Sequence, residues 1–263
     1  MDYDQAEYWS EVARKVDARG GDGDWDLAGN DGPFHRYKRD MTLARLETLG
    51  VAGATVMELG PGPGGNLRAL HAQSPKRLIG CEIAPEMVRL AKRNLGSDAE
   101  IYQIEGPHLP LADGEADIAL TVTVLQHNPK STVLALLDEL TRVTSSTLEL
   151  IEDTTTFRPR SFGGTYFVRD VTQYIAWVTS RGFALVDVQP MNAWASERAW
   201  LGLRRLARAV TCRTYSEGQP VTKAEIALER AVLRATRPVD ARLPPLSGKT
   251  AMRFQRLDVA GSA

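Results

Sequence analysis

Apolar residues near the start of the chain recur at helical spacing, with one interruption. Tyr8, Trp9 and Val12 fall on one side of a predicted helix, and the same spacing resumes over residues 34–50. Between them, the glycine- and aspartate-rich residues 18–33 predict a loop. The pattern therefore predicts a helical leader, residues 1–50, ahead of the first strand.

After this leader, short apolar runs alternate with longer amphipathic segments. The runs predict strands and the segments predict helices, an alternation typical of a mostly parallel sheet with helices on both faces. The predicted strands are residues 54–59, 77–83, 99–105, 116–124, 146–153, 183–191 and 250–257. The intervening predicted helices begin near residue 66 and cover residues 84–96, 130–144 and 170–183. We predict an α/β fold with a doubly wound, mostly parallel, seven-stranded Rossmann-like sheet.

One segment breaks the alternation, because residues 195–249 carry two helical patterns between the last two predicted strands. Since strands of the same sheet flank this segment, we interpret it as a helical insertion or lid. The predicted organisation is a helical cap (1–50), a core (51–194), the insertion (195–249) and a final strand with tail (250–263).

Composition narrows the classes of partner. The 263 residues are 43% hydrophobic and 25% charged, values that are ordinary for a globular domain. A net charge of -1 argues against nucleic acid as a partner. Two distant cysteines exclude a disulfide scaffold and favour a cytoplasmic protein. We find no signal-peptide pattern and no apolar run of about 18 residues, so we predict no transmembrane segment.

The stretch MELGPGPGGN, residues 57–66, follows the first predicted strand. Its glycines fit both G-x-G-x-x-G, the dinucleotide fingerprint, and E-x-G-x-G-x-G. Missing side chains let a ligand lie on the backbone, and the next helix presents free N–H groups. Glu82, at the end of the second strand, offers acceptors to ribose hydroxyls. Because dinucleotides and adenosyl ligands both contain ribose, these features leave the ligand open.

Four segments, in this order, resemble class I S-adenosylmethionine-dependent methyltransferases: VMELGPGPGGNL, LIGCEIAPEMVRLAKRNL, IEGPHLPLADGEADIALTVTVLQHN and LELIED. Glu58, the L-P-x-x-D-G-x-x-D run from Leu109 to Asp117, and the helical leader favour this family over a nicotinamide enzyme. The resemblance covers residues 34–190 and implies S-adenosylmethionine as cofactor. An NAD(P)-dependent oxidoreductase and a catalytically inactive S-adenosylmethionine-binding protein are the alternatives.

For the methionine part of the cofactor, the resemblance implies contacts from the glycine loop and the leader. Glu58 would orient the ammonium, and the carbonyl of Thr121 would accept a hydrogen bond from it. Tyr37 and Lys38 would close over the carboxylate. The loop residues assigned to the cofactor are Gly60, Pro61, Gly62, Gly64 and Asn66, and the three glycines would pass beneath the methionine part.

For the nucleoside part, the resemblance implies that Glu82 holds the ribose hydroxyls and that Ile83 packs on adenine. Glu105 stands where the family commonly has an Asp that accepts from the adenine amino group, and the Gly106 N–H would reach a ring nitrogen. Met87 completes the implied cofactor-binding set.

Because the sulfonium methyl of this cofactor is already activated, the enzyme chiefly aligns a nucleophile and excludes water. A hydroxyl or ammonium acceptor also needs a base, and histidine suits that role near neutral pH. His127, just beyond the fourth strand, is the first catalytic candidate, although a helix cap or packing on the cofactor would explain it equally well. His35, in the leader, is the second. Glu152 and Asp153, at the end of the fifth strand, lie at the same edge of the sheet.

Two departures from related patterns bear on the acceptor. No Asn/Asp-Pro-Pro-Tyr/Phe follows the fourth strand, which disfavours methylation of nucleobases and of glutamine amides. Thr121 and Thr123 stand where catechol-type enzymes carry a magnesium carboxylate, so we predict no metal site. We expect metal-independent transfer to a small-molecule acceptor, with O-methylation favoured and N- or C-methylation open.

The insertion at 195–249 is where this family builds its acceptor pocket or lid. Trp200 and Leu203 share an apolar face, with Arg204, Arg205 and Arg208 beside it. This pattern suits a lid over an apolar acceptor, with arginines for an anionic group. It equally suits a basic amphipathic helix on a membrane surface, or an ordinary packed helix with solvated arginines. The sequence leaves the oligomeric state unassigned.

Overall fold

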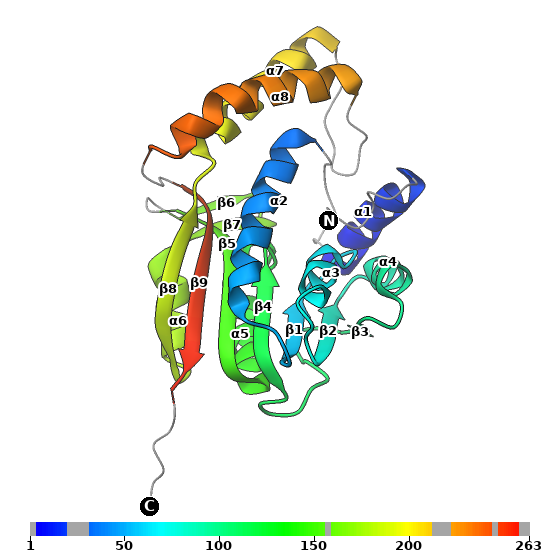
Figure 1. Ribbon diagram of the computed structural model, residues 1–263, viewed down its shortest axis with the longest axis vertical. Coiled ribbons are helices and arrows are strands. Elements are labelled where there is room, and N and C mark those ends of the chain that lie inside the picture. Colours follow the sequence, from blue (N-terminus) through cyan, green and yellow to red (C-terminus); the bar gives the residue numbers. More distant parts are fainter. Residues whose placement is uncertain (1–3, 20–31, 156–158, 212–221, 244–246, 258–263) are drawn as a thin grey trace, which may run out of the picture.

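The strands of the protein form one twisted sheet that crosses the molecule (Figure 1). The computed structural model describes residues 4–19, 32–155, 159–211, 222–243 and 247–257. Seven strands follow the order β3-β2-β1-β4-β5-β9-β8, and the pair β6 and β7 adjoins the end of β5. The strands are β1 (Thr55–Leu59), β2 (Arg77–Glu82), β3 (Glu100–Gln103), β4 (Ala116–Val122), β5 (Thr144–Thr155), β6 (Arg160–Phe162), β7 (Tyr166–Asp170), β8 (Phe183–Met191) and β9 (Ser247–Arg256).

The strand pairing confirms the predicted doubly wound sheet. Strands β1 to β5 pair in parallel, whereas β9 runs antiparallel to both β5 and β8. Each of the seven predicted strands is present; β9 begins at Ser247, three residues before its predicted start at residue 250. Because β1 to β4 are parallel neighbours, their carboxyl ends meet at one edge, where ligands bind in open α/β sheets.

Helices cover both faces of this sheet (Figure 1). They are α1 (Gln5–Arg19), α2 (Pro33–Leu46), α3 (Gly65–His71), α4 (Pro85–Leu95), α5 (Lys130–Val143), α6 (Val171–Thr179), α7 (Trp194–Thr211) and α8 (Lys223–Asp240), with short 3-10 turns η1 (Glu47–Leu49) and η2 (Leu125–His127). The two longest of the described helices, α7 and α8, occupy the predicted insertion. The division of the chain into four parts stays a prediction.

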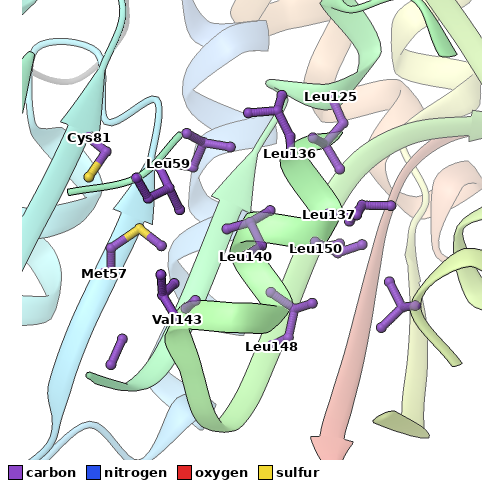
Figure 2. Packing of buried hydrophobic residues seen from close by; sticks show 14 of the residues in the cluster. Met57, Leu59, Cys81, Leu125, Leu136, Leu137, Leu140, Val143, Leu148 and Leu150 are labelled. Carbon is purple, nitrogen blue, oxygen red and sulfur yellow. The ribbon is translucent and has the colours of Figure 1, made fainter. Parts of the chain in front are cut away.

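Alternating side chains of β1 divide the core between two layers. Val56 packs with Leu67 of α3, whereas Met57 packs on the opposite side with Leu140 of α5, as expected for a strand buried on both faces. Figure 2 shows the second layer, where Leu136, Leu137, Leu140 and Val143 of α5 point toward the strands. This packing fixes the edge at which the β1 and β4 loops begin.

A buried ion pair fixes α2 to the sheet. Arg45, 5% exposed, donates from Nε and Nη2 to the carboxylate of Glu149 in β5 at 2.5 and 3.2 Å. Arg253 of β9 donates to the same carboxylate at 2.7 Å. Two guanidinium groups therefore balance one buried carboxylate and join α2, β5 and β9.

The sequence pattern missed the hairpin of β6 and β7. Phe162 pairs with Tyr166 across a turn that contains Gly163 and Gly164, both with positive φ. Two glycines between short runs rich in aromatic residues are a hairpin signal, but the three residues of β6 are too few to form a strand pattern in the sequence. The hairpin places Tyr166 beside the end of β5. Among the described helices, none is long and apolar enough to cross a membrane.

Candidate active site

The glycine loop after β1 needs glycine for two separate reasons. At Gly60, with φ of 68°, an added Cβ would lie 2.5 Å from Cγ2 of Val124. At Gly64, the same atom would lie 2.7 Å from Cδ1 of Leu95 in α4. At Gly62 it would meet nothing within 4 Å, although φ is 55°. Close packing thus requires Gly60 and Gly64, and Gly62 leaves open space above the loop.

A cavity of about 170 Å³ lies at the carboxyl ends of β1, β2 and β4. The predicted site residues that line it are Gly60, Gly62, Glu82, Ile83, Met87, Gly106 and His127. The structure therefore brings together the loop, the end of β2 and the turn after β4. The remaining predicted residues do not line this cavity.

Glu82, 5% exposed, is held by the backbone around it. Its Oε2 accepts from the Gly62 N–H at 3.1 Å, and its Oε1 accepts from the Ile83 and Ala84 N–H groups at 2.9 and 3.0 Å. Burial raises the pKa of Glu82, and these three hydrogen bonds oppose that rise. Since a carboxylate has about four acceptor positions, Oε2 retains capacity for one further donor.

Glu58 is fully buried at the end of β1, below the loop. Asn66 of α3 donates to its Oε1 at 2.7 Å, whereas its Oε2 is buried without a hydrogen-bond partner. Burial raises the pKa of this carboxyl to about 8. An unpartnered buried oxygen is costly, so the site suits a ligand that brings a donor or a positive charge.

Besides Glu58, Gly64 and Asn66, five of the predicted cofactor residues lie outside the cavity lining. The side chain of Glu105 is exposed, and that of Thr121 is buried and donates to Glu152 at 3.3 Å. Tyr37 lies under the guanidinium of Arg237 at 4.3 Å, and Lys38 lies near Glu197 of α7. Pro61 is buried in the loop, where it packs near Gly80 of β2.

Helix α1 closes one side of the cavity, a role that the sequence pattern left unassigned. Gln5 donates to the carbonyl of His127 at 2.5 Å and to Asn128 Oδ1 at 3.0 Å. Trp9 lines the cavity, and its ring meets that of His127 edge-on at 5.2 Å. Helical spacing placed Trp9 on the apolar side of α1; only the long-range fold shows which surface that side covers.

The turn after β4 carries backbone strain beside the cavity. Thr123, which lines it, has φ of 58°, a conformation that β-branched residues rarely adopt. Glu152 of β5 holds the next three residues, because its carboxylate accepts from the N–H groups of residues 124, 125 and 126, each at 3.1 Å. The orientation of η2, and so of His127, depends on this buried carboxylate.

His127 joins the cavity to a second group of polar side chains. Its ring lies 5.4 Å from that of Tyr166, whose hydroxyl donates to Asp153 Oδ2 at 2.5 Å. The other oxygen, Asp153 Oδ1, is buried without a hydrogen-bond partner. Burial would raise the pKa of Asp153, but the charges of Lys38 and Lys249 lower it. The carboxylate is therefore ionised and has free acceptor capacity.

Two lysines face this carboxylate from different elements. Lys249, the register partner of Asp153 on β9, donates to the Thr42 hydroxyl at 3.3 Å. Burial, followed by the charge of Lys38, lowers the pKa of Lys249 to about 8. Lys38 of α2 lies 3.8 Å from Glu197, and the charge of Asp153 raises its pKa. We call Lys38, Asp153, Tyr166 and Lys249 the acceptor-side cluster.

His35 lies one turn before Lys38 on α2. Its Nε2 is buried without a hydrogen-bond partner, and its ring meets Trp200 of α7 edge-on at 5.2 Å. Burial lowers the pKa of His35 to about 3, and the charges of Lys38, Arg204 and Lys249 add to this effect. The imidazole is therefore neutral at physiological pH and has a free hydrogen-bonding nitrogen.

The residues present fit an adenosyl cofactor with a methionine tail. A glycine floor opens upward at Gly62, Glu82 keeps one acceptor position, and Glu58 Oε2 lacks a donor. Among the described residues, no group of three or more His, Cys, Asp and Glu side chains could hold a metal ion. Metal independence of the reaction stays a prediction.

Residues 56–147 match the family model of the methyltransferase domain. None of the curated proteins matches the chain significantly. The fold is similar to that of the [4+2]-cyclase SpnF, with a TM-score of 0.66 and 14% identity over 96% of this chain and 95% of that one. It is also similar to geranyl diphosphate C-methyltransferase from Streptomyces coelicolor A3(2), solved with S-adenosyl-L-homocysteine, with a TM-score of 0.62 and 14% identity over 96% and 99% of the chains.

A third similar structure is phosphoethanolamine N-methyltransferase 2 from Haemonchus contortus, solved with S-adenosyl-L-methionine. Its TM-score is 0.63 at 10% identity, over 97% of this chain and 59% of that one. At these identities the similar structures establish the fold, and the family model adds the activity. Residues 56–147 are therefore a methyltransferase domain, in a fold shared with S-adenosylmethionine-dependent methyltransferases; the protein is an enzyme, and S-adenosylmethionine is its cofactor.

Proposed function

We propose that this enzyme methylates a cytoplasmic small molecule at an O–H or N–H group, with O-methylation favoured. One observation carries the proposal: His127 lines the cofactor cavity and also contacts Tyr166 of the acceptor-side cluster. A proton-accepting group thus lies between the cofactor cavity and a set of polar side chains with unused hydrogen-bonding capacity. That position suits the deprotonation of an acceptor during methyl transfer.

S-adenosylmethionine supplies a methyl group that is activated by its positively charged sulfur. The chain, in this proposal, binds the two ends of the cofactor through backbone and carboxylate groups. Glu82 Oε2 accepts from one ribose hydroxyl, Glu58 faces the ammonium, and Gly62 leaves room for the methionine tail. Trp9 and Gln5 of α1 exclude water from the cavity, which favours transfer to the acceptor over side reactions. Roles for the predicted residues outside the cavity lining stay predictions.

The proposed roles of the two histidines differ because their surroundings differ. His127 accepts the proton of the acceptor, since its ring borders the cavity. With a pKa of about 3, the His35 ring is neutral near neutral pH and is a weak base, so we assign it a hydrogen bond to the acceptor rather than proton transfer. Asp153 Oδ1 accepts a second hydrogen bond from the acceptor molecule. Trp200 of α7 covers the apolar part of that molecule.

A methyl-transfer screen tests this proposal. Wild-type enzyme and S-adenosylmethionine are incubated with a panel of phenols, alcohols, hydroxy acids and amines, and products gaining one methyl group are sought by mass spectrometry. For an accepted compound, we expect His127→Ala to lower kcat by about 100-fold while S-adenosylhomocysteine binds nearly as before. His71→Ala, which changes an exposed histidine, is the matched control. A fully active His127→Ala enzyme would remove the proposed base.

A further inference from the structure

A second groove, of about 540 Å³, lies between α8 and the start of α2, where the two helices cross (Figure 1). Its lining combines an apolar floor with a set of guanidinium groups. The apolar residues are Pro33, Ile226 and Leu233, and the basic residues are Arg36, Arg230, Arg234 and Arg237. The groove therefore concentrates positive charge, and among the described residues no acidic side chain lines it.

Three of these arginines lie on one face of α8, at spacings of four and three residues. Arg237 stacks on the ring of Tyr37 at 4.3 Å, which holds its guanidinium in place. Within the described part of the chain, neither Arg230 nor Arg234 has an ion-pair partner. Like charges at this helical spacing repel one another. The face is thus destabilising by itself, and a bound anion would relieve that repulsion.

The acidic residues of α8 are used elsewhere, so they cannot neutralise this face. Glu225 forms the capping box with Thr222. Glu229 is buried, and its carboxylate accepts from Trp200 Nε1 at 3.1 Å and from the Phe34 N–H at 3.3 Å. Asp240 is buried as well and accepts from the Ala195 N–H at the start of α7 at 2.7 Å. The carboxylates of α8 therefore form contacts within the fold, whereas Arg230, Arg234 and Arg237 line the groove.

The arginines of α7, which the sequence suggested for an anionic group, have other surroundings. Arg204 lies 3.3 Å from Glu229 and 5.1 Å from the Trp200 ring, and Arg198 lies over the ring of Trp194 at 5.7 Å. The side chain of Arg208 lies outside the described residues. Arg205 is exposed but lies outside the groove, so the arginines that gather at the groove come mainly from α8.

We propose that this groove binds a phosphate-bearing ligand, through Arg230 and Arg234 and with Arg36 and Arg237 on either side. Guanidinium groups match phosphate through paired N–H donors, and several on one surface favour a group with more than one negative charge. The floor of Ile226 and Leu233 suits an organic part attached to the phosphate. This proposal is independent of the acceptor and of the identity of the base.

The test uses full-length protein and two probes that separate a soluble phosphate from a membrane headgroup. Pyrophosphate binding is measured by titration calorimetry, and vesicles of phosphatidylglycerol or of phosphatidylcholine are used in flotation assays. We expect saturable pyrophosphate binding that weakens as salt rises. The Arg230→Gln/Arg234→Gln variant should bind at least about tenfold more weakly, because both guanidinium groups are lost. Flotation only with phosphatidylglycerol, and only in wild type, would assign the phosphate to a membrane surface.

A matched control removes the same charge elsewhere. In Arg205→Gln/Lys92→Gln, two exposed cations outside the groove are lost, and affinity should change by less than about twofold. Stabilisation by S-adenosylhomocysteine checks that every variant is folded. If the Gln variant fails that check, Arg230→Lys/Arg234→Lys, which keeps the charge but loses the paired donors, should still bind more weakly than wild type. Absence of binding to both probes by wild type, or equal loss in the control, would overturn the proposal.

Discussion

The two halves of the active site are built in different ways. Around the cofactor cavity, the glycine loop and the end of β2 act mainly through backbone groups that are close in sequence, as when Gly62 donates to Glu82. The acceptor-side cluster instead joins side chains from α2, β5, β7 and β9, which are far apart in the chain. Residues 58–84 supply much of the first half, which distant α1 closes, whereas every contact of the second half depends on how distant elements pack.

The strongest way to break the acceptor half is to remove the anchor of α2. Glu149→Ala leaves the guanidinium of Arg45 buried without its carboxylate, and we expect the free energy of unfolding to fall by about 3–5 kcal/mol. Chemical denaturation measures this loss. Asp187→Ala removes the half-exposed partner of the same arginine and should cost under about 1 kcal/mol. Equal effects of the two changes would show that the buried pair does not anchor the helix.

In the cofactor half, Gly60→Ala tests the backbone directly. The new Cβ would lie 2.5 Å from Val124 Cγ2, so we expect a loss of about 1–3 kcal/mol and weaker binding of S-adenosylhomocysteine. Thermal unfolding with and without that ligand measures both effects. Gly50→Ala, also at positive φ but with open space around it, should cost about 1 kcal/mol and leave binding unchanged. Adding Val124→Ala should recover part of the loss, and no recovery would contradict the steric explanation.

A smaller effect is expected from the buried carboxyl of Glu58. Burial raises its folded pKa to about 8 from an ordinary value of 4.5, so between these values the folded state holds a proton that the unfolded chain releases. Stability without cofactor should therefore fall as pH rises from about 5 to 8. Glu58→Gln cannot ionise and should lose less over that range, by on the order of 1–2 kcal/mol.

Unfolding curves of wild type and Glu58→Gln at both pH values measure this difference. Glu86→Gln, at a half-exposed position in the first turn of α4 where the carboxylate pairs with Arg89, is the control and should follow the wild type. Parallel losses in wild type and Glu58→Gln would show that the carboxyl is not protonated in the folded protein.

Sequence patterning predicted the sheet because each strand repeats a two-residue alternation or a continuous apolar run, and glycine-ended helices separate them. It also found residues such as Gly62, Glu82 and His127, which the structure brings to one cavity. Lys249 and Tyr166 escaped notice because nothing near them in sequence suggests a site. Strand register brings Lys249 beside Asp153, and the β6–β7 hairpin brings Tyr166 to the same carboxylate. Both placements are consequences of tertiary folding.

Adjacent residues of β5 contact the two halves, and in the proposed function this contact would link the binding of the two ligands. Glu152 holds the turn that borders the cofactor cavity, and Asp153 belongs to the acceptor-side cluster. A ligand that orders one of these residues restricts the other through a single strand. Because such coupling is reciprocal, a cofactor that improves affinity for the acceptor must itself be held more tightly once the acceptor is bound. In the proposed function, each of the two ligands would thus favour binding of the other.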